Sequence, residues 1–160
     1  VSDYMEIGLM YAGSSALALA AGTGLKAVID RDRPYMYFSD PPESEIENGD
    51  YKDSFPSRHT IMAFSGAAYT STVFALMYPD SSLRTPVCAV AWTLAAGTAA
   101  LRVASGSHFV SDVLAGALIG SFSGFIVPYA SDRFGWVSAD EGRAGFSITP
   151  RGFSATIRLD

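Results

Sequence analysis

The chain has 160 residues, of which 49% are hydrophobic and 17% are charged, and its mean hydropathy is +0.21. This length fits one domain. The formal net charge is −5, so the chain offers no basic face and we exclude nucleic acids as partners. Its single cysteine, Cys88, cannot form a disulfide within this chain. The chain begins with Val1 rather than methionine, and we expect it to be a trimmed piece of a longer protein.

Long apolar segments dominate the sequence. They span residues 7–29, 60–78, 86–103 and 108–129. Each is close to the roughly 20 residues that cross a bilayer core, and each is rich in small residues that let helices approach closely. A soluble bundle with a buried core has a similar composition, so that alternative stays open. We expect an all-α fold, an antiparallel helical bundle embedded in a membrane.

The polar residues fall into two regions outside these segments. Residues 35–55 form an acidic loop with a short helix expected near Glu43–Glu47, and residues 131–160 form a polar C-terminal tail. In the tail, residues 146–157 alternate apolar and polar around a central Pro-Arg-Gly sequence, which predicts a small β-hairpin. We therefore expect a helical core over residues 1–130, followed by the tail.

One motif joins the last two apolar segments, with Arg102, then His108 six residues later, then Asp112 four residues after that. If a helix begins at His108, the histidine and Asp112 share a face. A carboxylate that holds one imidazole nitrogen leaves the other free to attack or to carry a proton. Taken alone, the spacing is equally typical of a helix start with a surface carboxylate.

Two further motifs lie at the ends of other apolar segments. They are Lys26-x6-Arg33-Pro34 and Pro56-Ser57-Arg58-His59. In a bundle whose helices alternate in direction, all three motifs meet at the same end. The lysine and arginines suit a phosphate or a similar oxyanion, and the two histidines, the only ones in the chain, suit acid–base and nucleophilic work.

Together the three motifs resemble the type 2 phosphatidic acid phosphatase (PAP2) superfamily, which includes bacterial class A acid phosphatases and vanadium haloperoxidases. The family pattern is K-x6-RP, then P-S-G-H, then S-R-x5-H-x3-D, and the resemblance covers residues 26–112 with their flanking helices. It implies a phosphatase that needs no metal and no cofactor. The chain departs from the pattern twice, with Arg58 in place of glycine and Leu101 in place of serine.

The resemblance also implies roles for individual residues. His108 attacks phosphorus and becomes a phosphohistidine, while Asp112 holds its imidazole in the required tautomer. His59 protonates the leaving alkoxide and then activates water. The phosphoryl oxygens are bound by Lys26, Arg33, Ser57 and Arg102. Arg58 offers its backbone N–H, and its side chain either contacts the substrate or narrows the pocket.

A site at the rim of a membrane bundle suits a phosphomonoester or pyrophosphate on a lipid. With the motif residues set aside, the site side carries the acidic loop and the far side carries Arg84, Arg133 and Arg143, and positive charge marks the cytoplasmic side. We therefore expect a bacterial inner-membrane protein whose site faces the periplasm. The alternatives are a soluble periplasmic acid phosphatase, a vanadate-dependent haloperoxidase of the same fold, and a non-catalytic lipid-binding protein.

Overall fold

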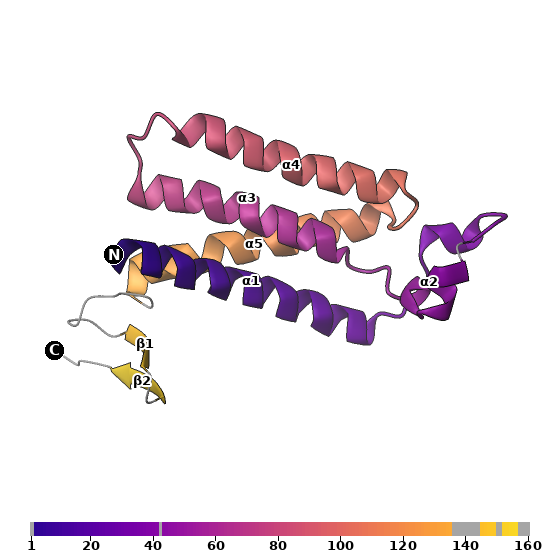
Figure 1. Ribbon diagram of the computed structural model, residues 1–160, viewed down its shortest axis with the longest axis horizontal. Coiled ribbons are helices and arrows are strands. Elements are labelled where there is room, and N and C mark those ends of the chain that lie inside the picture. Colours follow the sequence, from indigo (N-terminus) through magenta and orange to yellow (C-terminus); the bar gives the residue numbers. More distant parts are fainter. Residues whose placement is uncertain (1, 42, 136–144, 150–151, 157–160) are drawn as a thin grey trace.

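The computed structural model describes residues 2–41, 43–135, 145–149 and 152–156. Four long helices run side by side in alternating directions (Figure 1). They are α1 (Ser2–Val28), α3 (Arg58–Met77), α4 (Arg84–Ala104) and α5 (Val110–Phe134). The predicted all-α antiparallel bundle is confirmed. Its helix boundaries follow the apolar segments, and the extended backbone of Arg33 just before Pro34 separates α1 from the acidic loop.

The acidic loop between α1 and α3 is folded into short helices at one end of the bundle (Figure 1). These are η1 (Pro34–Tyr37), α2 (Glu43–Glu47) and η2 (Asp50–Lys52), so the helix expected at Glu43–Glu47 is confirmed. A parallel bridge between Arg31 and Asp53 ties the two ends of the loop together. The Ser54 N–H donates to the Arg31 carbonyl at 3.0 Å, which continues this pairing toward α3.

The C-terminal region contains the predicted hairpin, in which β1 (Gly145–Thr149) pairs antiparallel with β2 (Gly152–Thr156). The expected Pro-Arg turn between the strands lies outside the described residues. α5 continues to Phe134, past the boundary that we expected at residue 130. The other parts of the expected tail, residues 136–144 and 157–160, also lie outside the described residues.

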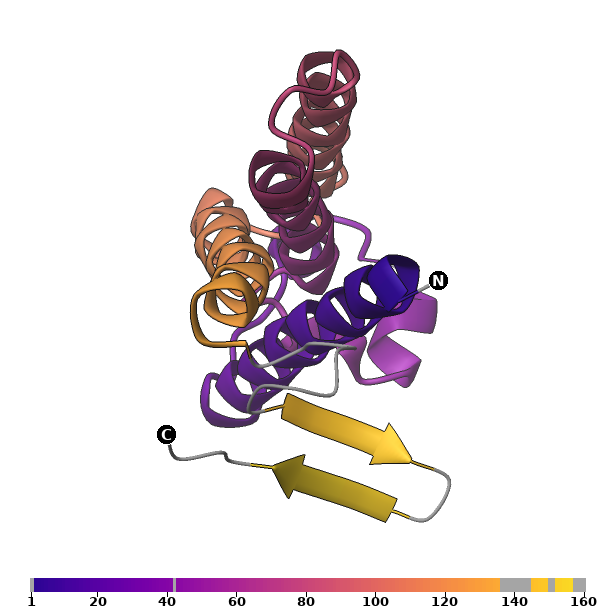
Figure 2. The same cartoon turned by 90° about the vertical axis from the view of Figure 1, so that its left-hand side faces the viewer.

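All four long helices are long and apolar enough to cross a membrane. Large apolar side chains remain exposed along them, including Leu94 and Leu118, which are 66% and 75% exposed. α4 is the outermost helix and packs mainly on α3 (Figure 2). An apolar surface of this extent is unusual for a soluble monomer, and it is compatible with insertion into a bilayer.

The closest helix contact is between α3 and α5, where glycines at every fourth position of α5 let the backbones touch. A Cβ added at Gly120 would lie 2.2 Å from the Ile61 carbonyl oxygen, and one at Gly124 would lie 2.2 Å from the Ser65 carbonyl oxygen. Small residues at this spacing are a common device for close packing of membrane helices. The contact fixes the first half of α3 against the middle of α5.

We expect Gly124→Ala to destabilise the protein by about 1–3 kcal/mol, since the added methyl group overlaps backbone atoms that cannot move independently. Thermal unfolding in detergent measures the effect. Gly24→Ala is the matched control, because a Cβ at Gly24 meets nothing within 4 Å. Equal melting temperatures for the two variants would contradict the packing described for α3 and α5.

Candidate active site

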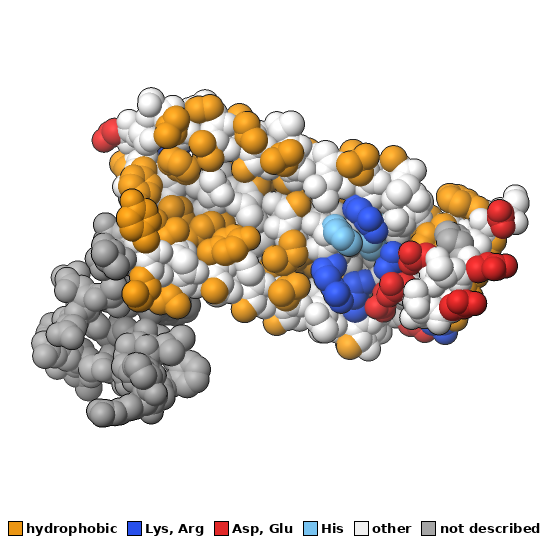
Figure 3. Space-filling model, in the orientation of Figure 1, with side chains coloured by type: hydrophobic (Ala, Val, Ile, Leu, Met, Phe, Trp, Pro, Cys, Tyr) orange, Lys and Arg blue, Asp and Glu red, His pale blue; other side chains and the backbone are white. Residues whose placement is uncertain are grey.

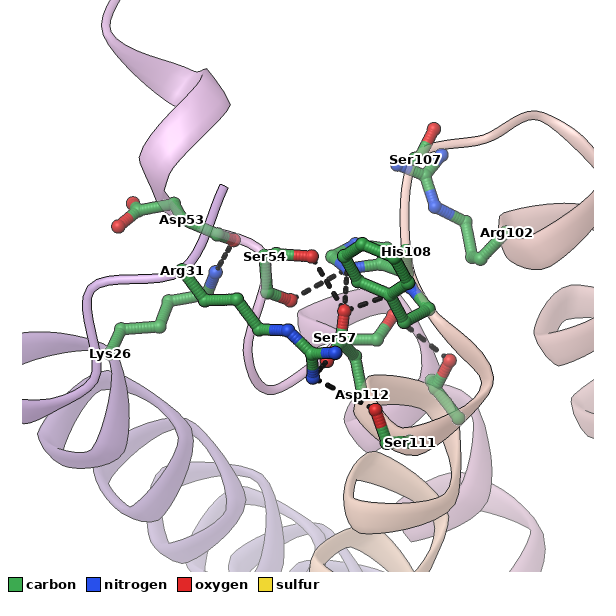
Figure 4. Close-up of polar contacts among 12 residues, drawn as sticks. Lys26, Arg31, Asp53, Ser54, Ser57, Arg102, Ser107, His108, Ser111 and Asp112 are labelled. Atoms are coloured by element: carbon green, nitrogen blue, oxygen red, sulfur yellow. Dashed lines mark hydrogen bonds and ion pairs between the residues drawn. The ribbon is translucent and has the colours of Figure 1, made fainter. Parts of the chain in front are cut away.

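The three sequence motifs meet at the end of the bundle that carries the short helices. Lys26 lies in the last turn of α1 and Arg102 in the last turn of α4, while His108 precedes α5 (Figure 4). His59 lies in the first turn of α3. On the surface, histidine side chains are flanked by lysine and arginine side chains, with acidic side chains beyond them (Figure 3). The sequence prediction that these segments converge therefore agrees with the fold.

His108 is buried, with 3% of its surface exposed, and one ring nitrogen is fixed by the backbone. Its Nδ1 lies 2.7 Å from the carbonyl oxygen of Ser54 (Figure 4). A carbonyl oxygen only accepts hydrogen bonds, so Nδ1 must carry the proton. In the neutral imidazole the lone pair then resides on Nε2, which is the form required of a nucleophile.

The structure brings His108 and Asp112 together, though not by the helical spacing that we expected. α5 begins at Val110, so His108 lies before the helix and the spacing of four residues does not place the two side chains on one helical face. The Asp112 Oδ2 is 3.8 Å from His108 Nδ1, too far for a hydrogen bond. The two side chains are therefore neighbours, as predicted, and the role of Asp112 in setting the histidine tautomer stays a prediction.

The carboxylate of Asp112 is occupied by other donors. Its Oδ2 accepts from the Phe109 N–H at 2.9 Å and from Ser54 Oγ at 2.5 Å, and its Oδ1 accepts from Arg31 Nη1 at 2.5 Å. The contact with Phe109 is the reach of an N3 carboxylate back to the N-cap of its own helix. Asp112 is thus linked to His108 by hydrogen bonds through Ser54, whose hydroxyl it binds and whose carbonyl binds the imidazole, and its charge also lies 3.8 Å from His108 Nδ1.

Arg31 is the residue that sequence reasoning missed. Besides Asp112, its Nη1 donates to Ser111 Oγ at 2.8 Å, and its guanidinium lies 4.2 Å above the centre of the Phe109 ring. A signal was present, because Arg31 and Arg33 are two residues apart before a proline, and alternate residues of an extended segment share a side. Arg31 braces the start of α5 and so supports the segment that carries His108.

Two arginines border a hollow of about 300 Å³ at this end of the bundle, together with the buried Tyr35. The Nε atoms of Arg33 and Arg102 and the Tyr35 hydroxyl are buried, and they have no hydrogen-bond partner within the described part of the chain. Leaving a buried donor unpaired costs about 1–3 kcal/mol, so these three groups are available to an oxyanion, and the carboxylates of Asp40 and Glu45 line the same hollow. Lys26 donates to the Asp53 carbonyl beside them.

Comparison with known proteins agrees with this arrangement. The family model of the PAP2 superfamily matches residues 5–136, which is most of the chain and includes every candidate site residue. The chain belongs to the PAP2 superfamily. This membership supports a hydrolase of the phosphatase type. No curated protein and no solved structure matches the chain significantly.

The motif Pro56-Ser57-Arg58-His59, which departs from the PAP2 pattern at Arg58, leads into the start of α3. Ser57 is buried before α3, where its N–H donates to the Asp112 carbonyl at 3.1 Å and its Oγ accepts from Thr60 at 3.0 Å. Arg58, which replaces the family glycine, is exposed and starts α3 without a positive φ. Its N–H is among the first donors of the helix, which have no partner within the helix itself.

The PAP2 site holds His108 in the neutral form. Burial lowers the pKa of its imidazole from 6.5 to about 4, and the charges of Arg33 and Arg102 act in the same direction. The hydrogen bond to Ser54 and the charge of Asp112 oppose this shift without cancelling it. Since the imidazole is protonated only below its folded pKa, it is neutral between about pH 5 and 8.

We expect His108 in the free protein to titrate near pH 4, well below the usual 6.5. Unfolded chains take up this proton near pH 6.5, so the histidine favours unfolding as the pH falls from about 6.5 to 4. NMR of histidine-labelled protein in detergent measures the value, and His59→Gln leaves a single histidine signal. A His108 signal that titrates at or above pH 6.5 would contradict the burial and charge described for this site.

Proposed function

We propose that this PAP2 protein hydrolyses a phosphomonoester or pyrophosphate on a lipid through a phosphohistidine at His108. The observation that carries the proposal is the buried imidazole, whose Nδ1–H is committed to the Ser54 carbonyl, near two arginines with unpaired buried donors. A poised nucleophile beside an oxyanion site is the pairing that phosphoryl transfer requires.

In the first step, His108 Nε2 attacks phosphorus, and the bond from phosphorus to the ester oxygen breaks as the P–N bond forms. His59 in its protonated form gives its proton to the leaving oxygen, which departs as an alcohol. Arg33 and Arg102 neutralise the charge on the phosphoryl oxygens in the transition state. These two arginines thereby provide the charge neutralisation that bound metal ions provide in kinases.

In the second step, neutral His59 takes a proton from water, the water oxygen bonds to phosphorus, and the P–N bond breaks. Inorganic phosphate and neutral His108 result, and His59 is again protonated for the next cycle. Lys26, Ser57 and the Arg58 backbone N–H complete the set of donors around the phosphate. Asp112 acts in both steps as a positioning residue, since it holds the Ser54 that orients the His108 imidazole.

The position of the site supports a lipid substrate. The exposed apolar helices are compatible with a bilayer, and the candidate site lies at one end of them, where a head group would meet water. Arg84 and Arg133 lie at the opposite end of the bundle. With the cations of the three site motifs set aside as ligands of the phosphate, the positive-inside rule supports a site that faces the periplasm of a bacterial inner membrane. The expected Arg143 lies outside the described residues.

The experiment is phosphate release from a panel of lipid phosphates in detergent, with and without EDTA. The panel contains phosphatidic acid, phosphatidylglycerophosphate, a polyprenyl pyrophosphate and lipid A phosphate. We expect turnover of at least one lipid at an equal rate in EDTA. Absence of release from every lipid, or halide oxidation on addition of vanadate without phosphatase activity, would overturn the proposal in favour of a binding protein or a haloperoxidase.

A further inference from the structure

An apolar groove of about 300 Å³ runs between α1, α3 and α4, away from the polar end of the bundle. Small side chains form much of its lining. The residues that define it here are Tyr11, Met62, Gly66, Thr70, Ala91 and Ala95. Gly66 leaves real space there, because a Cβ added at this position meets nothing within 4 Å. The hydroxyl of Thr98, also in the lining, is already bound to the Leu94 carbonyl at 2.9 Å.

The groove continues the surface that carries the candidate site. Met62, Gly66 and Thr70 follow Arg58 at intervals of four residues, so they lie on one face of α3, next to the face of His59. At 1.5 Å per residue, Met62 lies about 6 Å and Thr70 about 18 Å along the helix from Arg58. Half of a hydrocarbon core is about 15 Å thick, so the groove begins in the leaflet nearest the site and reaches about the middle of the bilayer.

We propose that this groove holds the hydrocarbon chain of the phosphorylated lipid substrate. The inference rests on the proposed function. His59, the proposed acid, must meet the leaving oxygen, and the lipid is attached to that oxygen. A chain that extends from there into the bilayer enters the groove one helical turn from His59, at Met62. Apolar side chains also cover the surface beside the histidine and its flanking cations (Figure 3).

The groove acts through its shape rather than through a hydrophobic driving force. Inside a bilayer the chain is surrounded by equally apolar lipid, so burial against protein adds little hydrophobic gain. A groove that fits the chain instead fixes the direction of the lipid, which places the phosphate in line with the nucleophile. Widening or narrowing the groove should therefore change the efficiency for long-chain substrates and leave short-chain substrates unaffected.

The test is Gly66→Leu, which puts a side chain into the open part of the groove without a backbone clash. The probes are dioleoyl and dihexanoyl phosphatidic acid in the same detergent, with phosphate release as the readout. Gly97→Leu is the matched control, because Gly97 lies on α4 outside the lining and also has open space for a Cβ. Misfitting an apolar pocket by a methylene changes kcat/KM by about 10- to 200-fold, so we expect at least a tenfold loss on the long-chain lipid.

Support requires that Gly66→Leu lose activity on the dioleoyl lipid alone and that Gly97→Leu resemble the wild type on both lipids. If Gly66→Leu changes kcat/KM on the dioleoyl lipid by less than twofold, the proposal that the groove holds the lipid chain is overturned, while the phosphatase proposal stands. Equal losses on both lipids also overturn it, because the substitution then acts on the site or the fold. A wild-type protein that hydrolyses neither phosphatidic acid overturns the groove inference for this lipid, while the phosphatase proposal stands if another lipid of the panel releases phosphate.

Discussion

Replacing His108 by alanine is expected to abolish phosphate release while phosphate binding persists. The variant lacks the Nε2 that would attack phosphorus, whereas the arginines around the phosphate are unchanged. Loss of a covalent nucleophile lowers kcat by at least about 10⁴-fold. Phosphate release from a lipid phosphate in detergent measures the loss, and competition by inorganic phosphate for a fluorescent analogue measures the remaining binding.

The matched control for this variant is His59→Ala, which removes the other histidine. The proposed acid matters most when the leaving group is a poor one, such as a lipid alcohol. His59→Ala should therefore release a first equivalent of p-nitrophenolate much faster than a first equivalent of lipid alcohol, because p-nitrophenolate departs without a proton, while later turnovers are slow on both substrates because the second step lacks its base. His108→Ala should fail on both substrates. Residual activity above about a hundredth of wild type in His108→Ala would remove this residue as the nucleophile.

Asp112→Ala is expected to lower the free energy of unfolding by about 2–4 kcal/mol and to impair catalysis as well. The carboxylate is fully buried, and its removal leaves Arg31, Ser54 and the Phe109 N–H without their acceptor. Breaking a buried pair costs about 3–5 kcal/mol, and the 35% exposure of Arg31 reduces that figure. Unfolding in detergent measures the stability, and a loss below 1 kcal/mol would contradict this network.

Asp112 can affect catalysis either by acting directly on His108 or by holding Ser54, and a variant of Ser54 separates these two roles. If the carboxylate acted directly on His108, Ser54→Ala would leave kcat nearly unchanged. Because Asp112 holds the Ser54 hydroxyl and the Ser54 carbonyl holds His108, we expect Ser54→Ala to lower kcat about tenfold with little change in KM. The pKa of His108 in this variant is a second readout. It should fall as the Nδ1 contact loosens, because the hydrogen bond to the Ser54 carbonyl raises this pKa.

Much of the fold could be predicted because it depends on simple regularities of the sequence. Four apolar segments of bilayer length predicted the helices, and alternation of their direction brought Lys26, His59 and Arg102 to one end. The alternating pattern of residues 146–157 likewise predicted a hairpin that is present. Helix length, direction and strand alternation are local properties, so a single sequence carries them.

The inner contacts of the site could not be predicted, because they depend on backbone atoms and on long-range pairing. The Ser54 carbonyl reaches His108 only because the loop returns to pair with Arg31, a contact that no side-chain pattern records. The helix boundary also mattered, since a start at Val110 lets Asp112 bind the N-cap backbone instead of the histidine. The residue type of Asp112 was informative, but its partner was decided by competition among nearby donors.

The central claim is that phosphorus passes through a covalent bond to His108. The most direct measurement is rapid quenching of the protein with a lipid phosphate labelled at phosphorus, followed by alkaline digestion and mass spectrometry. Our account predicts one labelled peptide, with phosphate on His108, and no label in His108→Ala. Label on another residue, or single-turnover release of phosphate with no labelled protein at any time, would contradict it.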